Sequence, residues 1–240
     1  IDEENEGEIL AVSLDNKGVP MIKKELKKSN KKKSKRKKDK TGKKKMSTVS
    51  AVYTIDKNHR TIEDVVEEVI ESEKAIKEKR SPKGPESKAD RPKPKNKIVR
   101  ATMRGKENAA EELKKQVEKR DPLNKKERVA LVDGEHVLRK LIKDYLPNFC
   151  IIIDLFHVLE YIWHASYVFN RVDTPEAENW VSIRLRMLLE GKVVCIIEEL
   201  KDALKTMKLS SYKRFRLKQA ITYLKNGKDF INEELIECLL

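Results

Sequence analysis

The chain has 240 residues, of which 38% are hydrophobic and 39% are charged, and its formal net charge is +14 at pH 7. This length suits one large domain or one domain with an insertion, and the high charged fraction predicts that part of the chain is solvated linker. Cys150, Cys195 and Cys238 are too scattered for a zinc site or a disulfide framework, and no apolar stretch reaches the ~18 residues of a membrane span. We expect a cytoplasmic protein whose two ends, Ile1 and Leu240, continue into a longer chain.

Most of the net charge lies in one block, residues 27–45. The block reads KKSNKKKSKRKKDKTGKKK and carries +12 of the +14, with thirteen Lys and Arg against one Asp. A block of this kind is typical both of a solvated loop and of a segment that binds nucleic acid. The candidate nucleic-acid-binding residues are Lys31, Lys32, Lys33, Lys35, Arg36, Lys37, Lys38, Lys43, Lys44 and Lys45.

Two apolar runs, residues 8–15 and 18–24, flank Asn16-Lys17-Gly18. This pattern predicts a β-hairpin with its turn at the Gly. Asp15 would then end the first strand, either as an ordinary turn residue or as a ligand held out from the sheet. Residues 45–56 alternate apolar with small or polar side chains and are rich in β-branched types, which predicts a third strand.

The next segment begins with a helix signal. Thr61 and Asp64 have the spacing of a capping box, and apolar residues follow at helical intervals. Residues 81–97 are rich in Pro and Lys and predict a linker. A short edge strand is expected at 98–103 and a helix at 107–120.

The following segment alternates short apolar runs with helical patterns. Short joins between strand and helix imply parallel strands with right-handed crossovers. From residue 155 onward the pattern is helical, with breaks near residues 173–175, Gly191, residues 210–211 and Gly227. The predicted elements before those breaks are strand 128–133, helix 134–146, strand 149–154 and helix 155–169.

This order of elements predicts an α/β ribonuclease-H-like fold, a mixed sheet of three antiparallel strands followed by parallel strands, with an all-helical insertion. The core would be residues 1–154 and the insertion residues 155–240. In that fold Asp15 lies on the central strand and Asp133 at the end of its neighbour. Two carboxylates placed in this way suit Mg²⁺ or Mn²⁺.

Each of the other candidate residues has a structural alternative. Asp133 precedes a helical pattern and is also a good helix N-cap. Asp154 is either an alternative second acid or the N-cap of helix 155–169. His157 is either a core histidine or a residue that supports a metal ligand.

Several motifs together resemble ISKra-type insertion-sequence transposases, which are relatives of the Mutator-like DDE transposases. They are VSLDNKGVPM, KKKMSTVSAVYTID, RPKPKNKIVRATM, VALVDGEHVL and IIIDLFHVLEYIW, in this order between residues 8 and 235. The resemblance implies that Asp15 and Asp133 are the first two acids of the catalytic triad. It also aligns Asp154 and His157 with a D-x-x-H signature of the wider superfamily.

The third acid of that family lies in a motif similar to SGVIEGA, and the 240 residues contain no such motif. The resemblance implies two-metal cleavage and joining of DNA, so we expect a truncated, inactive fragment of a nucleoid-associated transposase. Its partners would be transposon ends and target DNA, with a possible homodimer and no small-molecule substrate. The alternative is a non-catalytic nucleic-acid-binding protein of the same fold.

One later helix, residues 211–226, combines cations with aromatic side chains. The expected role of its basic face is solvation, with DNA contact as the alternative. Trp163 and Trp180 are expected in the core of the helical insertion. The cations and aromatic residues of this helix are Lys213, Arg214, Arg216 and Lys218 beside Tyr212 and Phe215.

Overall fold

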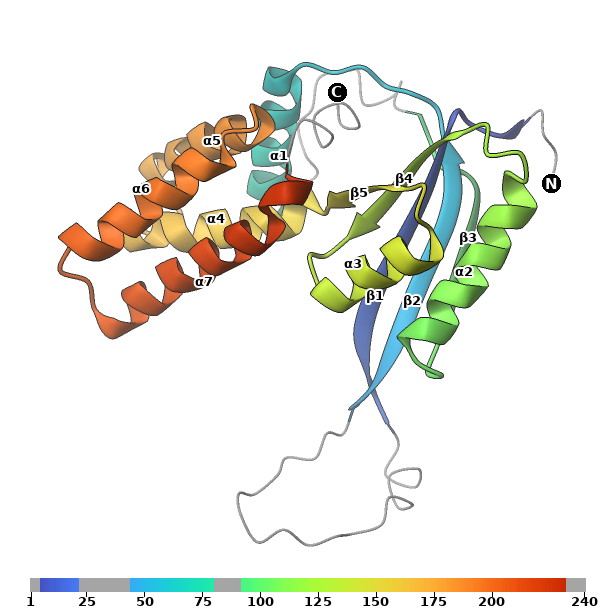
Figure 1. Cartoon of the computed structure of the whole chain (residues 1–240). Helices are drawn as coiled ribbons and strands as arrows, with labels where there is room; N and C mark the ends of the chain where they lie inside the picture. The colour runs from blue at the N-terminus through green and yellow to red at the C-terminus, as the bar shows by residue number, and fades with distance from the viewer. Residues whose placement is uncertain (1–4, 22–43, 80–91, 232–240) are drawn as a thin grey trace, which may run out of the picture.

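The computed structural model describes residues 5–21, 44–79 and 92–231. Its centre is one mixed five-stranded sheet with the strand order β3-β2-β1-β4-β5 (Figure 1). β2 pairs antiparallel with both β1 and β3, whereas β4 pairs parallel with β1 and β5 pairs parallel with β4. The strands are β1 Ile9–Pro20, β2 Lys44–Ile55, β3 Lys95–Thr102, β4 Glu127–Val132 and β5 Cys150–Ile153.

The predicted hairpin at Asn16-Lys17-Gly18 is wrong, because β1 runs through it as one strand. Asp15 pairs with Val49 and Gly18 with Met46 on β2, and the ladder continues to Pro20. Pairing with a twelve-residue partner outweighs the local turn preference of Asn and Gly. Asp15 therefore lies within a strand, and the connection to β2 spans residues 21–43.

The helices agree closely with the predicted ranges. The capping box at the start of α1 is confirmed, since Thr61 N donates to Asp64 Oδ2 (2.9 Å) and Asp64 N donates to Thr61 Oγ1 (3.2 Å). The predicted linker is partly wrong, because β3 already begins at Lys95. The helices are α1 Ile62–Lys77, α2 Lys106–Arg120, α3 His136–Tyr145, α4 Leu155–Phe169, α5 Pro175–Leu189, α6 Val193–Thr206, α7 Ser211–Gly227 and the 3₁₀ helix η4 Lys228–Phe230.

The sheet separates two hydrophobic clusters. Leu10, Val12 and Leu14 alternate along β1 and pack with α2 and α3 on one face. On the other face, Val129 and Ile153 join a larger cluster built from α1 and α4 to α7. The helical layer in Figure 1 therefore includes α1, which precedes residue 155 in the chain.

The breaks predicted in the helical part are confirmed. Gly191 adopts a φ of +72° between α5 and α6, and the Ser210 hydroxyl caps α7 by accepting from Lys213 N. Trp163 is buried in the helical layer, as expected. No helix among the described residues is long and apolar enough to cross a membrane.

Candidate functional site

The register of β1 and β4 brings the two principal candidate acids together. Leu14 on β1 is paired with Val132 on β4, and the two strands are parallel. Asp15 and Asp133 are the next residue in each chain segment, so they occupy neighbouring positions where β4 ends and β1 continues. Adjacent strands are about 5 Å apart, which is close enough for two carboxylates to share a cation.

Asp154 extends this row by one strand. Val132 is paired with Ile153 on β5, and Asp154 N donates to the Val132 carbonyl oxygen at 2.8 Å. Asp154 therefore lies beside Asp133 and two strands from Asp15. Asp15 within β1 and the aspartates directly after β4 and β5 thus form a row across three neighbouring strands, and we call this row of Asp15, Asp133 and Asp154 the carboxylate edge.

Asp15 and Asp133 each use one carboxylate oxygen locally. Asp15 Oδ1 accepts from Asn16 N at 2.6 Å, and Asp133 Oδ1 accepts from Glu135 N at 2.9 Å. Within the described residues, the second oxygen of each carboxylate makes no hydrogen bond. The N-cap position of α3 is Glu135, so Asp133 closes a turn and the predicted N-cap alternative is not what the structure contains.

Asp154 is the N-cap of α4, as one of the two alternatives predicted. Its Oδ1 accepts from Phe156 N at 2.9 Å. His157 is on the first turn of α4 with 46% of its side chain exposed, and its Nδ1 is 3.9 Å from Glu160 Oε2. The alternative of a core histidine is therefore wrong for His157.

A polar network beside Asp133 was not predicted from the sequence. Asn16 Nδ2 donates to Glu135 Oε2 at 2.5 Å, and Asn16 Oδ1 accepts from the Thr48 hydroxyl at 3.0 Å. Lys106 Nζ pairs with Glu135 Oε1. Because side chains alternate along β1, Asn16 points to the face opposite Asp15 and fixes the turn that holds Asp133. This contact could not be predicted once residues 16–18 were assigned to a turn, because side chains alternate between the two faces of the sheet only along a continuous strand.

Tyr223 on α7 packs against the same turn. Its hydroxyl donates to the Asp133 carbonyl oxygen at 3.1 Å, and its ring stacks on Tyr161 of α4 with centroids 4.0 Å apart. Gly134 has a φ of +88°, and a Cβ there would lie 3.0 Å from the Tyr223 hydroxyl oxygen. Burial, followed by the charges of neighbouring groups including Asp133, raises the pKa of Tyr223.

The structure describes only two of the candidate nucleic-acid-binding lysines. Lys44 and Lys45 are exposed and form the start of β2, as predicted for Lys45 by the strand 45–56, and β2 begins one residue earlier at Lys44. The candidates from Lys31 to Lys43 lie outside the described residues.

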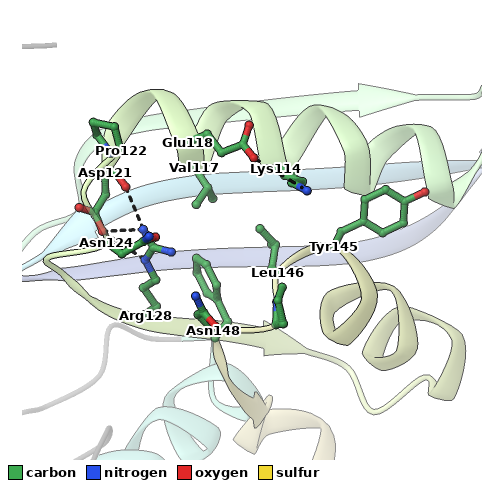
Figure 2. Close-up of a pocket in the computed structure, with 12 residues that line it drawn as sticks. Lys114, Val117, Glu118, Asp121, Pro122, Asn124, Arg128, Tyr145, Leu146 and Asn148 are labelled. Atoms are coloured by element: carbon green, nitrogen blue, oxygen red, sulfur yellow. Dashed lines mark hydrogen bonds and ion pairs between the residues drawn. The ribbon is translucent and has the colours of Figure 1, made fainter.

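A pocket lies at the opposite end of β4 from Asp133, and its β4 residue, Arg128, is about 17 Å from Asp133 along the strand. Its volume is about 430 Å³, and Figure 2 shows the Arg128 guanidinium directed at Asp121 inside it. This ion pair is 2.8 Å long and buried, so Arg128 is neutralised by its own neighbour. The pocket is therefore separate from the carboxylate edge and offers no free charge at Arg128.

The donor atoms of the carboxylate edge fit a hard divalent cation. Carboxylate oxygens are the ligands that Mg²⁺ prefers, and it keeps several waters when one or two carboxylates bind it. Among the described residues, no group of three or more His, Cys, Asp or Glu side chains is arranged to hold a metal ion. The candidate ligands of a divalent cation are therefore the neighbouring pair Asp15 and Asp133.

Comparisons with known proteins found no family model, no curated protein and no solved structure that matches this chain.

Proposed function

We propose that this chain is a DDE-type transposase that acts on DNA by two-metal phosphoryl transfer. The observation that carries the proposal is the parallel register of β1 and β4, in which Asp15 within β1 and Asp133 directly after β4 are neighbours. A turn aspartate needs no acidic neighbour, and two adjacent carboxylates repel each other unless a cation or proton lies between them. Adjacency of this kind favours metal binding over a purely structural role.

The proposed fold is ribonuclease-H-like, with the helical layer as an insertion. The antiparallel set β1, β2 and β3, with β4 and β5 parallel to β1, supports this proposal. The chain order differs from the expected one, because α1 lies between β2 and β3 where three consecutive strands were predicted. The sheet order also makes β1 central, with β4 as its neighbour. Ligands of open α/β sheets commonly bind outside the carboxyl ends of the strands, and Asp133 and Asp154 lie directly after the ends of β4 and β5.

In the proposed site, Asp15 and Asp133 hold Mg²⁺ or Mn²⁺, and the network of Asn16 and Glu135 orients the turn that carries Asp133. The bound cations would supply activation of a nucleophilic water or 3′-hydroxyl and stabilisation of the leaving oxygen. Asp154 is already used as the N-cap of α4, and we assign it no more than a supporting role.

The proposed partners are transposon ends and target DNA, and the proposed location is the nucleoid. Because the sequence contains no motif similar to SGVIEGA, a third acid is missing from the proposed site. Two carboxylates fix two cations poorly in near-octahedral geometry, so this chain should bind metal weakly and cleave DNA little or not at all.

The second candidate function is nucleic-acid binding without catalysis. The observation that favours it is the charge of residues 27–45, which carry +12 and need no metal to bind phosphate. The two candidates share the fold and differ in whether Asp15 and Asp133 bind a cation.

Isothermal titration with Mn²⁺ separates them. The transposase proposal predicts weak binding that is lost in Asp15→Asn and in Asp133→Asn. The matched control is Asp144→Asn, because Asp144 is an exposed carboxylate on α3 away from the edge. Equal Mn²⁺ binding by all four proteins, or none by the wild type, would contradict the proposal and leave the non-catalytic function.

A further inference from the structure

Helices α4 and α7 lie side by side and share one seam that begins at the carboxylate edge. Near the sheet, the rings of Tyr161 and Tyr223 stack across the seam. Farther out, Lys213 Nζ donates to the Val168 carbonyl oxygen at 2.7 Å. The seam therefore leads from the proposed metal ligands toward the start of α7, at the outer end of the helical layer in Figure 1.

Aromatic side chains follow the α7 side of this seam. Tyr212, Arg216 and Tyr223 lie within about 40° of one another around the helix, at 100° per residue. The exposed fraction of Tyr212 is 65%, and that of Phe215, at the flank of this row, is 55%. Two aromatic residues exposed to this degree within one turn are available to a partner and do not contribute to the core.

The same helix is strongly basic where these aromatic residues are exposed. Arg216 lies over the Tyr212 ring with its Cζ 5.2 Å from the centroid, and its Nε donates to the Tyr212 hydroxyl at 3.0 Å. Between Ser211 and Lys218 the chain has four cations and no acid. Across the seam, burial and then the charge of Arg216 lower the pKa of His164, which keeps this imidazole neutral at pH 7.

Carboxylates along the seam oppose an anionic partner. Glu160 is exposed on α4 and faces His157, as described above, and its charge raises the pKa of His164 while Arg216 lowers it. Four cations between Ser211 and Lys218 outnumber Glu160, and removal of its charge gives a test in the opposite direction. Asp133 and Asp154 add negative charge at the sheet end of the seam, where the proposed cation binds.

We propose that this seam binds an unpaired nucleic-acid strand and leads it to the carboxylate edge. The seam strip comprises Tyr161, His164, Tyr212, Phe215, Arg216 and Tyr223. Exposed aromatic rings bind bases by stacking only when those bases are unpaired, and the flanking cations attract the phosphates. The assignment of the strand as a reaction substrate rests on the proposed function, whereas strand binding itself does not.

Fluorescence anisotropy with a labelled single strand of about 20 nucleotides, in EDTA and at about 0.3 M salt, tests this inference. High salt suppresses the contribution of residues 27–45, which depends on counterion release, more than it suppresses stacking. Tyr212→Ala and Phe215→Ala should each lower the affinity about fivefold or more, and Tyr212→Phe should keep it within about twofold. Glu160→Gln should raise it.

The matched control for charge is Lys115→Gln, because Lys115 is an exposed lysine on α2, far from the seam, and should have no effect. Unchanged single-strand affinity in both alanine variants would overturn the inference. An equal loss for a duplex of the same sequence would also overturn it, because stacking requires unpaired bases. A change of oligomeric state without a change in strand affinity would reassign the surface to a protein partner. Since EDTA removes the metal, these outcomes are independent of the Mn²⁺ titration.

Discussion

The hydroxyl of Tyr223 donates a hydrogen bond to the backbone carbonyl oxygen of Asp133, with the two oxygens 3.1 Å apart. This contact joins the last long helix of the helical layer to the turn that carries a proposed metal ligand. The geometry of the carboxylate edge therefore depends on the docking of α7 as well as on the sheet.

Tyr223→Phe should lower the free energy of unfolding by about 0.5–1.5 kcal/mol, because it removes this hydrogen bond and keeps the stacked ring. Urea denaturation measures the loss. The control is Tyr145→Phe, since the Tyr145 hydroxyl makes no hydrogen bond within the described residues and should cost little. Equal stabilities of the two variants would contradict the structural role of the contact.

Gly134→Ala should destabilise the protein more than Gly191→Ala does. Both glycines have positive φ, so each substitution carries a backbone cost of about 1–2 kcal/mol. A Cβ at Gly191 meets nothing within 4 Å, whereas one at Gly134 approaches the Tyr223 ring, which cannot move freely because it is stacked on Tyr161. Comparison of the melting temperatures of the two variants isolates the steric effect. Equal decreases in melting temperature would show that α7 shifts to accommodate the added Cβ.

Glu135→Gln should weaken Mn²⁺ binding by about tenfold or more without abolishing it. Residues that orient a ligand typically affect metal affinity by 10- to 100-fold. Glu135 receives hydrogen bonds from Asn16 and Lys106, and loss of its charge should loosen the turn at Asp133. Titration calorimetry measures the effect against Glu107→Gln on α2, which should leave the affinity unchanged. Unchanged Mn²⁺ affinity of Glu135→Gln would show that the network has only a structural role.

Replacing residues 27–43 with a Gly/Ser segment of equal length should abolish most binding to duplex DNA at low salt. This segment contains eleven Lys and Arg and one Asp, and it leaves Lys44 and Lys45 in β2. The slope of log affinity against log salt concentration should flatten, because fewer counterions are released on binding. A slope that survives the replacement would assign the electrostatic contact to the cations of α7 or to other basic segments.

Most elements of this fold could be predicted from the sequence because their signals are local. The Thr61–Asp64 capping box and the apolar spacing of residues 155–169 identified α1 and α4, and short apolar runs identified β4 and β5. The same reliance on local signals produced the false hairpin, because the turn preference of Asn16 to Gly18 is visible in the sequence and the ladder to β2 is not.

The site could be predicted only in part for the same reason. Asp15 and Asp133 each end or interrupt an apolar run, which made them candidates, but their adjacency follows from a pairing between segments more than a hundred residues apart. The contacts of Asn16 with Glu135 and of Tyr223 with Asp133 also join distant segments. Local sequence patterns do not predict contacts between segments that are far apart in the chain.

The most direct test of the account is a crystal structure of the protein with Mn²⁺, with the ion located by its anomalous scattering. The account predicts a peak between β1 and β4, with a carboxylate oxygen from each of Asp15 and Asp133 about 2.1 Å from the ion and waters completing its coordination. A peak bound only by Asp154, or carboxylates of Asp15 and Asp133 that point apart with no ion between them at saturating Mn²⁺, would contradict it.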